Sequence, residues 1–270
     1  MFLQRALITF TIGPLALYII YLGGWFYFLP VAAILLLATY EYIHMFRLYR
    51  WHMSGWIVGT AVLSLLIISQ WFDPRYLAPA LLICLMIPMT YALILYERRQ
   101  SQTSLADWMT MMGGILLLGW VGGHFFLLRR VESMPWQWTM LAMLSTWIAD
   151  SGAYVVGKFL AGKIMGRHKL SPRLSPNKTV EGYLGGLFFG ILLTLAIAKY
   201  LLLPFLPALL IAIFASAVSP LGDLAISMIK REVGLKDSGT LFPGHGGALD
   251  RIDSLMWSVA AAYYLILFLN

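Results

Sequence analysis

Charged residues are scarce in this chain of 270 residues. Asp, Glu, Lys and Arg make up 11% of it, whereas hydrophobic residues make up 60%. Soluble domains carry about 25% charged residues, so this composition excludes an ordinary soluble domain. Cysteine is nearly absent too. The single Cys84 lies in an apolar run, which excludes an intrachain disulfide, and no Cys/His spacing suited to zinc is present.

Most of the sequence consists of long apolar runs. Crossing a bilayer takes roughly 20 mostly apolar residues. We count nine such runs, at about 3–22, 25–44, 55–72, 76–96, 106–128, 138–158, 181–200, 204–230 and 253–269. Irregular backbone cannot face lipid. The sequence therefore predicts an all-α, polytopic transmembrane helical bundle of about nine spans that forms a single integral membrane domain over residues 1–270.

The basic residues are distributed unevenly between the predicted loops. If Arg5 and the loops after even-numbered spans lie on one side, that side holds 15 of the 19 Lys and Arg residues. The positive-inside rule assigns such a side to the cytoplasm. We therefore expect a multi-pass protein of the cell membrane with a cytoplasmic N-terminus and with Asn270 outside. The net charge of +7 follows from this topology, so no nucleic-acid partner is expected.

The first half of the chain, residues 1–140, offers few polar residues within its spans. Glu41 and His44 lie one turn apart near the end of a span, which favours an interfacial polar pair over a catalytic role. Asp107 fits the start of a helix, where a carboxylate is stabilised.

The second half, residues 141–270, carries most of the polar residues that suggest chemistry. Asp150 lies inside an apolar stretch, and the basic loop at about 159–180 contains two helix-breaking Ser-Pro pairs. At the start of the next span, Thr179 and Glu181 fit a helix cap and a binding role equally well.

Three carboxylates are expected to converge near the end of the eighth run. Asp223, Ser227 and Lys230 are spaced to share one helix face, and Asp223 lies about 10 Å deeper than Lys230. Asp250 and Asp253 share a face at the start of the ninth run. If these helices are neighbours, the three Asp residues meet, and a divalent cation would offset their repulsion. Oxygen ligands alone favour magnesium, and a second cation is compatible with the site.

A glycine-rich stretch, GLKDSGTLFPGHGGALDR, joins the two runs and suits phosphate binding. Its glycines let backbone amides approach an anion, and Lys236, His245 and Arg251 supply charged donors. The bases at 163–178, taken alone, fit lipid headgroups better than a substrate. Buried Asp residues alone would also fit a proton relay in a transporter. Acidic and basic residues gather at the cytoplasmic ends of the last four predicted spans. Their presence together favours a polyphosphate site over either of these alternatives. No P-loop pattern is present.

The 27-residue pattern from Ser227 to Asp253 resembles the defining motif of the phosphatidate cytidylyltransferase family, also called CDP-diacylglycerol synthases. It reads S-x2-K-R-x4-K-D-x-G-x2-F-P-x-H-G-G-x2-D-R-x-D. ADSGAYVVGK at 149–158, HKLSP at 168–172 and SPNKTVEG at 175–182 extend the resemblance. The similarity is close over about the last 125 residues, whereas in the first half it rests on the number of spans.

This resemblance implies a reaction of CTP with phosphatidic acid that gives CDP-diacylglycerol and pyrophosphate, within membrane lipid, with Mg²⁺. A homodimer is compatible with it. The alternatives are a CTP-dependent lipid or polyprenol kinase and a transporter without chemistry. We assign catalysis to Asp223, Asp250, Lys230, Arg231 and His245, and metal binding to Asp223, Asp250 and Asp253. Substrate binding is assigned to Ser227, Lys236, Asp237, Arg251, Asp150, Asn177, Lys178, Thr179 and Glu181.

Overall fold

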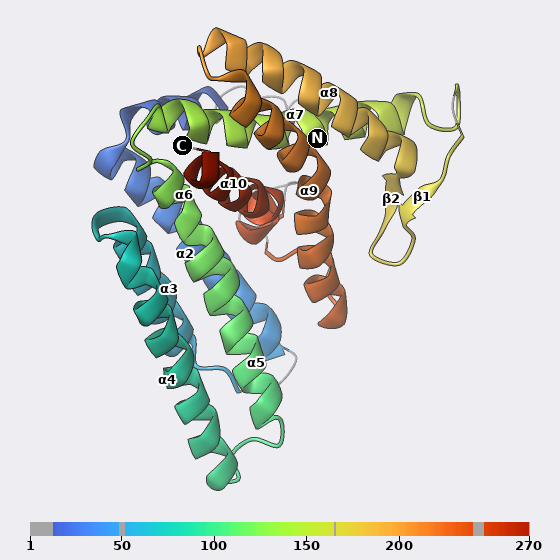
Figure 1. Ribbon diagram of the computed structural model, residues 1–270. Helices are drawn as coiled ribbons and strands as arrows, with labels where there is room; N and C mark the ends of the chain where they lie inside the picture. The colour runs from blue at the N-terminus through green and yellow to red at the C-terminus, as the bar shows by residue number, and fades with distance from the viewer. Residues whose placement is uncertain (1–12, 49–51, 165, 240–245, 270) are drawn as a thin grey trace.

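The structure, a computed structural model, describes residues 13–48, 52–164, 166–239 and 246–269 (Figure 1). Helices dominate it, and each predicted apolar run overlaps a helical segment among the described residues. After a first helix at Gly13–Leu22, the elements are α2 (Gly24–Leu48), α3 (Gly55–Trp71), η1 (Pro74–Tyr76), α4 (Leu77–Glu97), α5 (Ser104–Gly114), the π-helical η2 (Ile115–Val121), α6 (Gly122–Leu128), α7 (Pro135–Phe159), β1 (Lys169–Ser171), β2 (Ser175–Thr179), α8 (Val180–Tyr200), α9 (Phe205–Glu232) and α10 (Leu249–Leu269).

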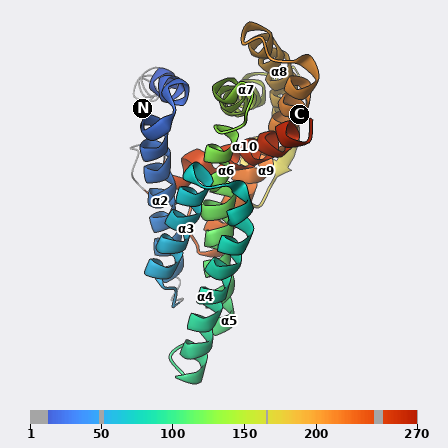
Figure 2. The same ribbon diagram turned by 60° about the vertical axis from the view of Figure 1, so that its left-hand side comes forward.

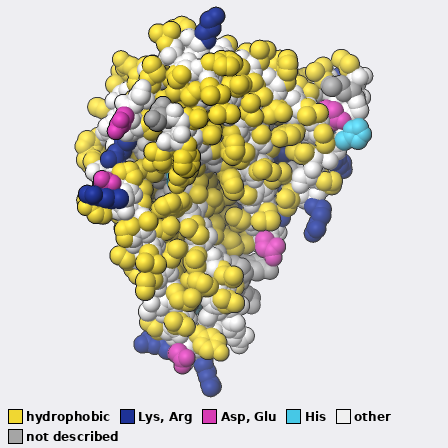
Figure 3. All heavy atoms as spheres, viewed as in Figure 1, with side chains coloured by type: hydrophobic (Ala, Val, Ile, Leu, Met, Phe, Trp, Pro, Cys, Tyr) yellow, Lys and Arg dark blue, Asp and Glu magenta, His cyan; other side chains and the backbone are white. Residues whose placement is uncertain are grey.

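Six of the described helical segments are long and apolar enough to cross a membrane. They are Gly24–Leu48, Pro74–Glu97, Ser104–Leu128, Val180–Tyr200, Phe205–Glu232 and Leu249–Leu269. Hydrophobic side chains also cover most of the face seen in Figure 3, as expected for contact with lipid. The predicted all-α, polytopic membrane fold is confirmed. The count of nine spans and the cytoplasmic N-terminus stay predictions, because Gly13–Leu22 and α3 are shorter and α7 is not among the six.

Helix α10 connects the two halves of the chain. It contacts α9 and α7 on one side and α6 and α2 on the other. Figures 1 and 2 show it between the α2–α6 helices and the group formed by α7, α8 and α9. Buried apolar residues of α10 belong to the same core as those of α2, α3 and α6. The residues at the start of α10 are therefore held by elements from both halves.

Small residues let α7 and α8 approach closely. On α8, Gly182, Gly186 and Gly190 recur every fourth residue. Gly182 and Gly186 face Ala149 and Ala153 of α7, and Gly190 lies against Ala149 and against Ser216 of α9. A Cβ at Gly186 would lie 2.7 Å from the Ala149 carbonyl oxygen. Association of membrane helices depends on such small residues, because lipid is as apolar as the side chains. This contact sets the position of α7, which carries Asp150.

A short β-hairpin occupies part of the predicted basic loop. Strand β1 pairs antiparallel with β2, with Lys169 opposite Thr179 and Ser171 opposite Ser175. The sequence predicted a basic loop at about 159–180 and no strand within it, so the hairpin is an addition to that prediction. The Ser-Pro pairs of this loop do exclude helix, but proline is tolerated in edge strands, and both strands here are edges.

The tight contact between α7 and α8 predicts a size limit at Gly186. Gly186→Ala should destabilise the protein by about 1–3 kcal/mol, because the added Cβ meets backbone that cannot move aside. Gly59→Ala in α3 is the matched control, since nothing lies within 4 Å of a Cβ there. Thermal unfolding in detergent should show a lower Tm for Gly186→Ala only. Equal Tm values for both variants would contradict the packing described.

Candidate active site

Asp223 forms the centre of a polar cluster that is open to the outside of the chain. Its Oδ2 lies 2.5 Å from Nζ of Lys178, and the Ser227 hydroxyl donates to its Oδ1 over 3.1 Å. The side chains of Lys178 and Asp223 are 27% and 34% exposed. Asp223 and Ser227 thus share a face of α9, as their spacing predicts. The β-hairpin places Lys178 opposite them.

Two further carboxylates lie within electrostatic reach of Asp223. Asp150 of α7 is exposed and accepts a hydrogen bond of 2.8 Å from the Ser219 hydroxyl of α9. Asp253 of α10 is buried, and the charges of Asp150 and Asp223 both act on it. Gly222 allows this approach, because its missing Cβ makes room for the backbone of α10 at Asp253. We call Asp150, Asp223 and Lys178 the accessible cluster, and Asp253 is its buried neighbour.

Lys230 and Asp250 form a second, buried pair. Lys230 Nζ donates to Asp250 Oδ1 over 2.5 Å, and the two side chains are only 10% and 7% exposed. The other oxygen of Asp250 accepts from the backbone N–H groups of Ser238 and Gly247 at 2.9 and 3.0 Å. A buried carboxylate needs such donors, because its lost hydration is otherwise uncompensated. Asp250 therefore holds both described ends of the segment that joins α9 to α10, through Ser238 at one end and Gly247 at the other.

The predicted three-carboxylate metal centre is only partly assembled. Asp223 and Asp253 are neighbours, but Asp250 is engaged with Lys230 and with backbone donors. Across the described ranges, no group of three His, Cys, Asp or Glu side chains is arranged to hold a metal ion. Asp150, which was predicted to bind substrate, lies within electrostatic reach of Asp223 and Asp253. It is therefore a neighbour of the predicted metal ligands, which the sequence did not indicate. Magnesium binding by these acids stays a prediction.

Most of the remaining predicted site residues in the described part of the chain are exposed. Arg231 is exposed and donates to the Leu235 carbonyl over 3.0 Å. The charge of Arg251 acts on Asp150. Lys236, Asp237, Arg251 and Asn177 are all exposed. His245 lies outside the described residues.

Thr179 and Glu181 have structural roles at the base of the hairpin. The Thr179 hydroxyl accepts from the Gly182 N–H at 3.0 Å and caps α8. Glu181 lies 2.6 Å from Nδ1 of His168 and also accepts from the His168 N–H at 3.1 Å. These bonds join the hairpin to α8 and so determine where Lys178 lies.

Glu41 is the functional candidate that the sequence did not reveal. Its carboxylate accepts hydrogen bonds from Ser238, Ala248 and Leu249, all next to the Lys230–Asp250 pair. The expected pairing with His44 is wrong: His44 is exposed and stacks on Tyr40. An acidic residue inside an apolar span does indicate a buried polar contact. The sequence around Glu41 does not indicate which residues make that contact, because they lie far along the chain.

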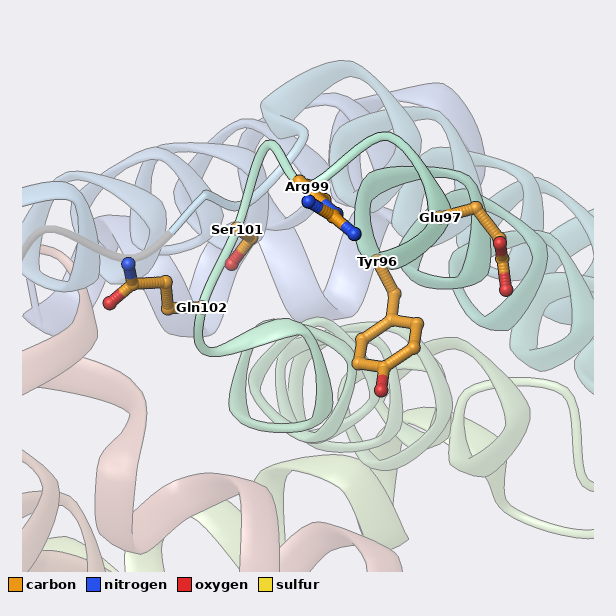
Figure 4. A pocket seen from close by; sticks show the side chains of 5 residues that line it. All are labelled: Tyr96, Glu97, Arg99, Ser101 and Gln102. Atoms are coloured by element: carbon orange, nitrogen blue, oxygen red, sulfur yellow. The ribbon is translucent and has the colours of Figure 1, made fainter.

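A surface hollow of about 530 Å³ lies at the turn between α4 and α5 (Figure 4). It contains none of the predicted site residues. Its lining comes from Tyr96, Glu97, Arg99, Ser101 and Gln102.

The accessible cluster and the residues around it have the types of groups that bind phosphate compounds and their counter-ions. Carboxylate and hydroxyl oxygens suit a hard cation, and the lysine and arginine side chains around them suit phosphate oxygens. Because Asp150, Asp223 and Lys178 are all reachable, a ligand can meet both kinds of group together.

Known proteins with similar sequences agree with this chemistry. A model of the Cytidylyltransferase family matches residues 3–269. The phosphatidate cytidylyltransferase of Synechocystis sp. is 33% identical over 296 aligned positions, which cover 98% of this chain and 97% of that protein. The phosphatidate cytidylyltransferase of Bacillus subtilis is 40% identical over 146 positions, and that of Staphylococcus saprophyticus is 41% identical over 151. Those two alignments each cover 53% of this chain, and 52% and 54% of the relatives. The resemblance predicted from the motif is confirmed, and the chain belongs to the cytidylyltransferase family of nucleotidyltransferase enzymes.

Proposed function

We propose that this protein transfers the cytidylyl group of CTP to phosphatidic acid and releases pyrophosphate. The observation that carries the proposal is the accessible cluster, in which Asp150 and Asp223 lie beside Lys178, with the buried Asp253 next to them. Relatives named phosphatidate cytidylyltransferase support the choice of both substrates.

The chemistry needs positioning and charge neutralisation more than a protein nucleophile. An oxygen of the lipid phosphate, already anionic, attacks the α-phosphorus of CTP. A new P–O bond forms while the bond from the α-phosphorus to the bridging oxygen breaks, and pyrophosphate leaves with that electron pair. No covalent enzyme intermediate is required. An in-line displacement of this kind is accelerated mainly by holding the reactants in place and by stabilising the charge that develops.

Basic residues on three elements would bind the phosphates. Lys178 comes from the hairpin, Arg231 from the end of α9 and Arg251 from the start of α10. Lys236 and His245, in the segment between α9 and α10, are proposed to bind the departing pyrophosphate with them. Lys230 acts from a buried position through Asp250.

Magnesium fits the oxygen atoms of the accessible cluster. Asp150 and Asp223 present carboxylates that are open to the outside, with the hydroxyls of Ser219 and Ser227 beside them. Magnesium is usually held by one or two carboxylates together with substrate phosphates, so a cage of three protein ligands is not needed. When bound, the ion would neutralise charge on the triphosphate.

The site is proposed to open toward the cytoplasm, where CTP is available, and sideways to the lipid. The basic loops at 158–178 and 230–251 flank it, and the positive-inside rule places such loops on the cytoplasmic side.

The proposed reaction predicts two products. Purified protein, Mg²⁺, phosphatidic acid and CTP labelled in the cytosine should yield a labelled lipid and free pyrophosphate in equal amounts. Lipid extraction and a pyrophosphate assay measure them. Release of CDP with a phosphorylated lipid would indicate a kinase, and nucleotide-independent flux through liposomes would indicate a transporter. Either result would refute the proposal.

The carboxylates are predicted to be individually essential. Asp223→Asn and Asp250→Asn should each lower incorporation of CTP into lipid by about 100-fold or more. The first removes a charge from the accessible cluster, and the second removes the buried partner of Lys230 and of the Ser238 and Gly247 N–H groups. Asp73→Asn, an exposed acid in the N-terminal half paired with Arg75, is the control and should retain activity. Both site variants should still insert and purify, with a lower Tm for Asp250→Asn because its buried ion pair with Lys230 is lost. Full activity in either one would remove that residue from the mechanism.

Removal of magnesium should stop the reaction without unfolding the protein. Chelation by EDTA is expected to abolish incorporation, and added Mg²⁺ should restore it, whereas the Tm should stay close to that of the untreated protein. Undiminished turnover in EDTA would contradict the role given to the accessible cluster.

A further inference from the structure

The carboxylate of Glu41, in α2, lies between the two described ends of the segment that joins α9 to α10. The Ser238 hydroxyl donates to Oε2 over 2.8 Å. On the other end, the Ala248 N–H donates to Oε1 over 2.9 Å and the Leu249 N–H donates to Oε2 over 3.0 Å. Glu41 is only 8% exposed. One side chain from the first half of the chain therefore joins residues that lie on both sides of 240–245.

The surroundings of Glu41 select for a carboxylate. All three partners are donors, and Ala248 and Leu249 present N–H groups at the start of α10, where the helix dipole favours negative charge. Within the described part of the chain, no basic side chain forms an ion pair with Glu41. A glutamine here would have to turn its NH₂ group toward a donor.

The segment approaches Glu41 closely enough to require glycine. A Cβ added at Gly239 would lie 2.5 Å from Oε1, and one added at Gly247 would collide with the same carboxylate. Both glycines belong to the motif, so two of its small residues make room for an acid from a distant helix. This contact gives the motif glycines a second use besides phosphate binding.

Glu41 also connects to the buried Lys230–Asp250 pair. The Ser238 hydroxyl lies 2.8 Å from Glu41 Oε2 and 3.0 Å from Asp250 Oδ2. A hydroxyl has one proton, so at any moment it donates to only one of them. The Ser238 N–H bonds to Asp250 at the same time. A shift of Glu41 would therefore move Ser238 and with it the donors of Asp250.

We infer that Glu41 is a positioning residue for cytidylyl transfer. It holds Ser238 and the first turn of α10 so that Lys230 and Asp250 keep their places beside the accessible cluster. The inference rests on the proposed function, and it gives the N-terminal half of the chain a direct part in the site.

The test is Glu41→Gln, measured as kcat and KM on folded, purified protein. Loss of a supporting partner of a site residue typically costs about 10–100-fold, so kcat should fall by that factor. The KM for CTP should change by less than about 3-fold, because no contact with substrate is removed. Ser238→Ala should also lower kcat. The double variant should lose less than the product of the two single effects, because both act through one contact.

Asp107→Asn is the matched control. Like Glu41, Asp107 is a buried carboxylate that accepts several hydrogen bonds. It lies in the first turn of α5, and its donors are His52, Ser101 and Thr103, all in the first half of the chain. It should lower the Tm as Glu41→Gln does, yet leave kcat per folded molecule unchanged. If both variants change only the Tm, Glu41 is structural and the inference fails. If the wild type forms no labelled lipid at all, the proposed function fails instead.

Discussion

The buried ion pair between Lys230 of α9 and Asp250 of α10 is the interaction on which the polar part of this molecule depends. Two charges removed from water are tolerated only when they pair well and when their remaining hydrogen-bonding groups find partners. Asp250 meets this condition through Ser238 and Gly247. Removing one partner of such a pair costs about 3–5 kcal/mol, so α9, α10 and the segment between them form one unit.

The buried pair and the accessible cluster have different surroundings, which suit different roles. Lys230 and Asp250 are buried, whereas Asp150, Asp223 and Lys178 can be reached from outside. The buried group can therefore hold the backbone while the accessible group meets the ligand. Close packing supports this division. Gly222 lets α10 approach α9, and Gly190 of α8 makes room for Ala149 of α7 and Ser216 of α9, near the bond between Asp150 and Ser219.

Features set by helical periodicity could be predicted from the sequence. The spacing of Asp223 and Ser227 predicted a shared face, and their hydrogen bond follows from it. The repeat of Gly182, Gly186 and Gly190 at every fourth position is likewise a pattern of helical periodicity, and it lies at helix contacts. The hairpin was missed, because three-residue and five-residue strands carry little pattern. The bonds of Glu41 could not be predicted, since its partners lie 197 to 208 residues away and depend on how α2 packs against α10.

The central claim is that Asp223 and its neighbours receive the charge of the CTP triphosphate together with magnesium. Direct binding of CTP to the purified protein, measured calorimetrically with and without Mg²⁺, tests it without relying on turnover. The wild type should bind CTP more tightly when Mg²⁺ is present, and Asp223→Asn should lose most of that enhancement. An equal enhancement by Mg²⁺ in the wild type and in Asp223→Asn would contradict the account.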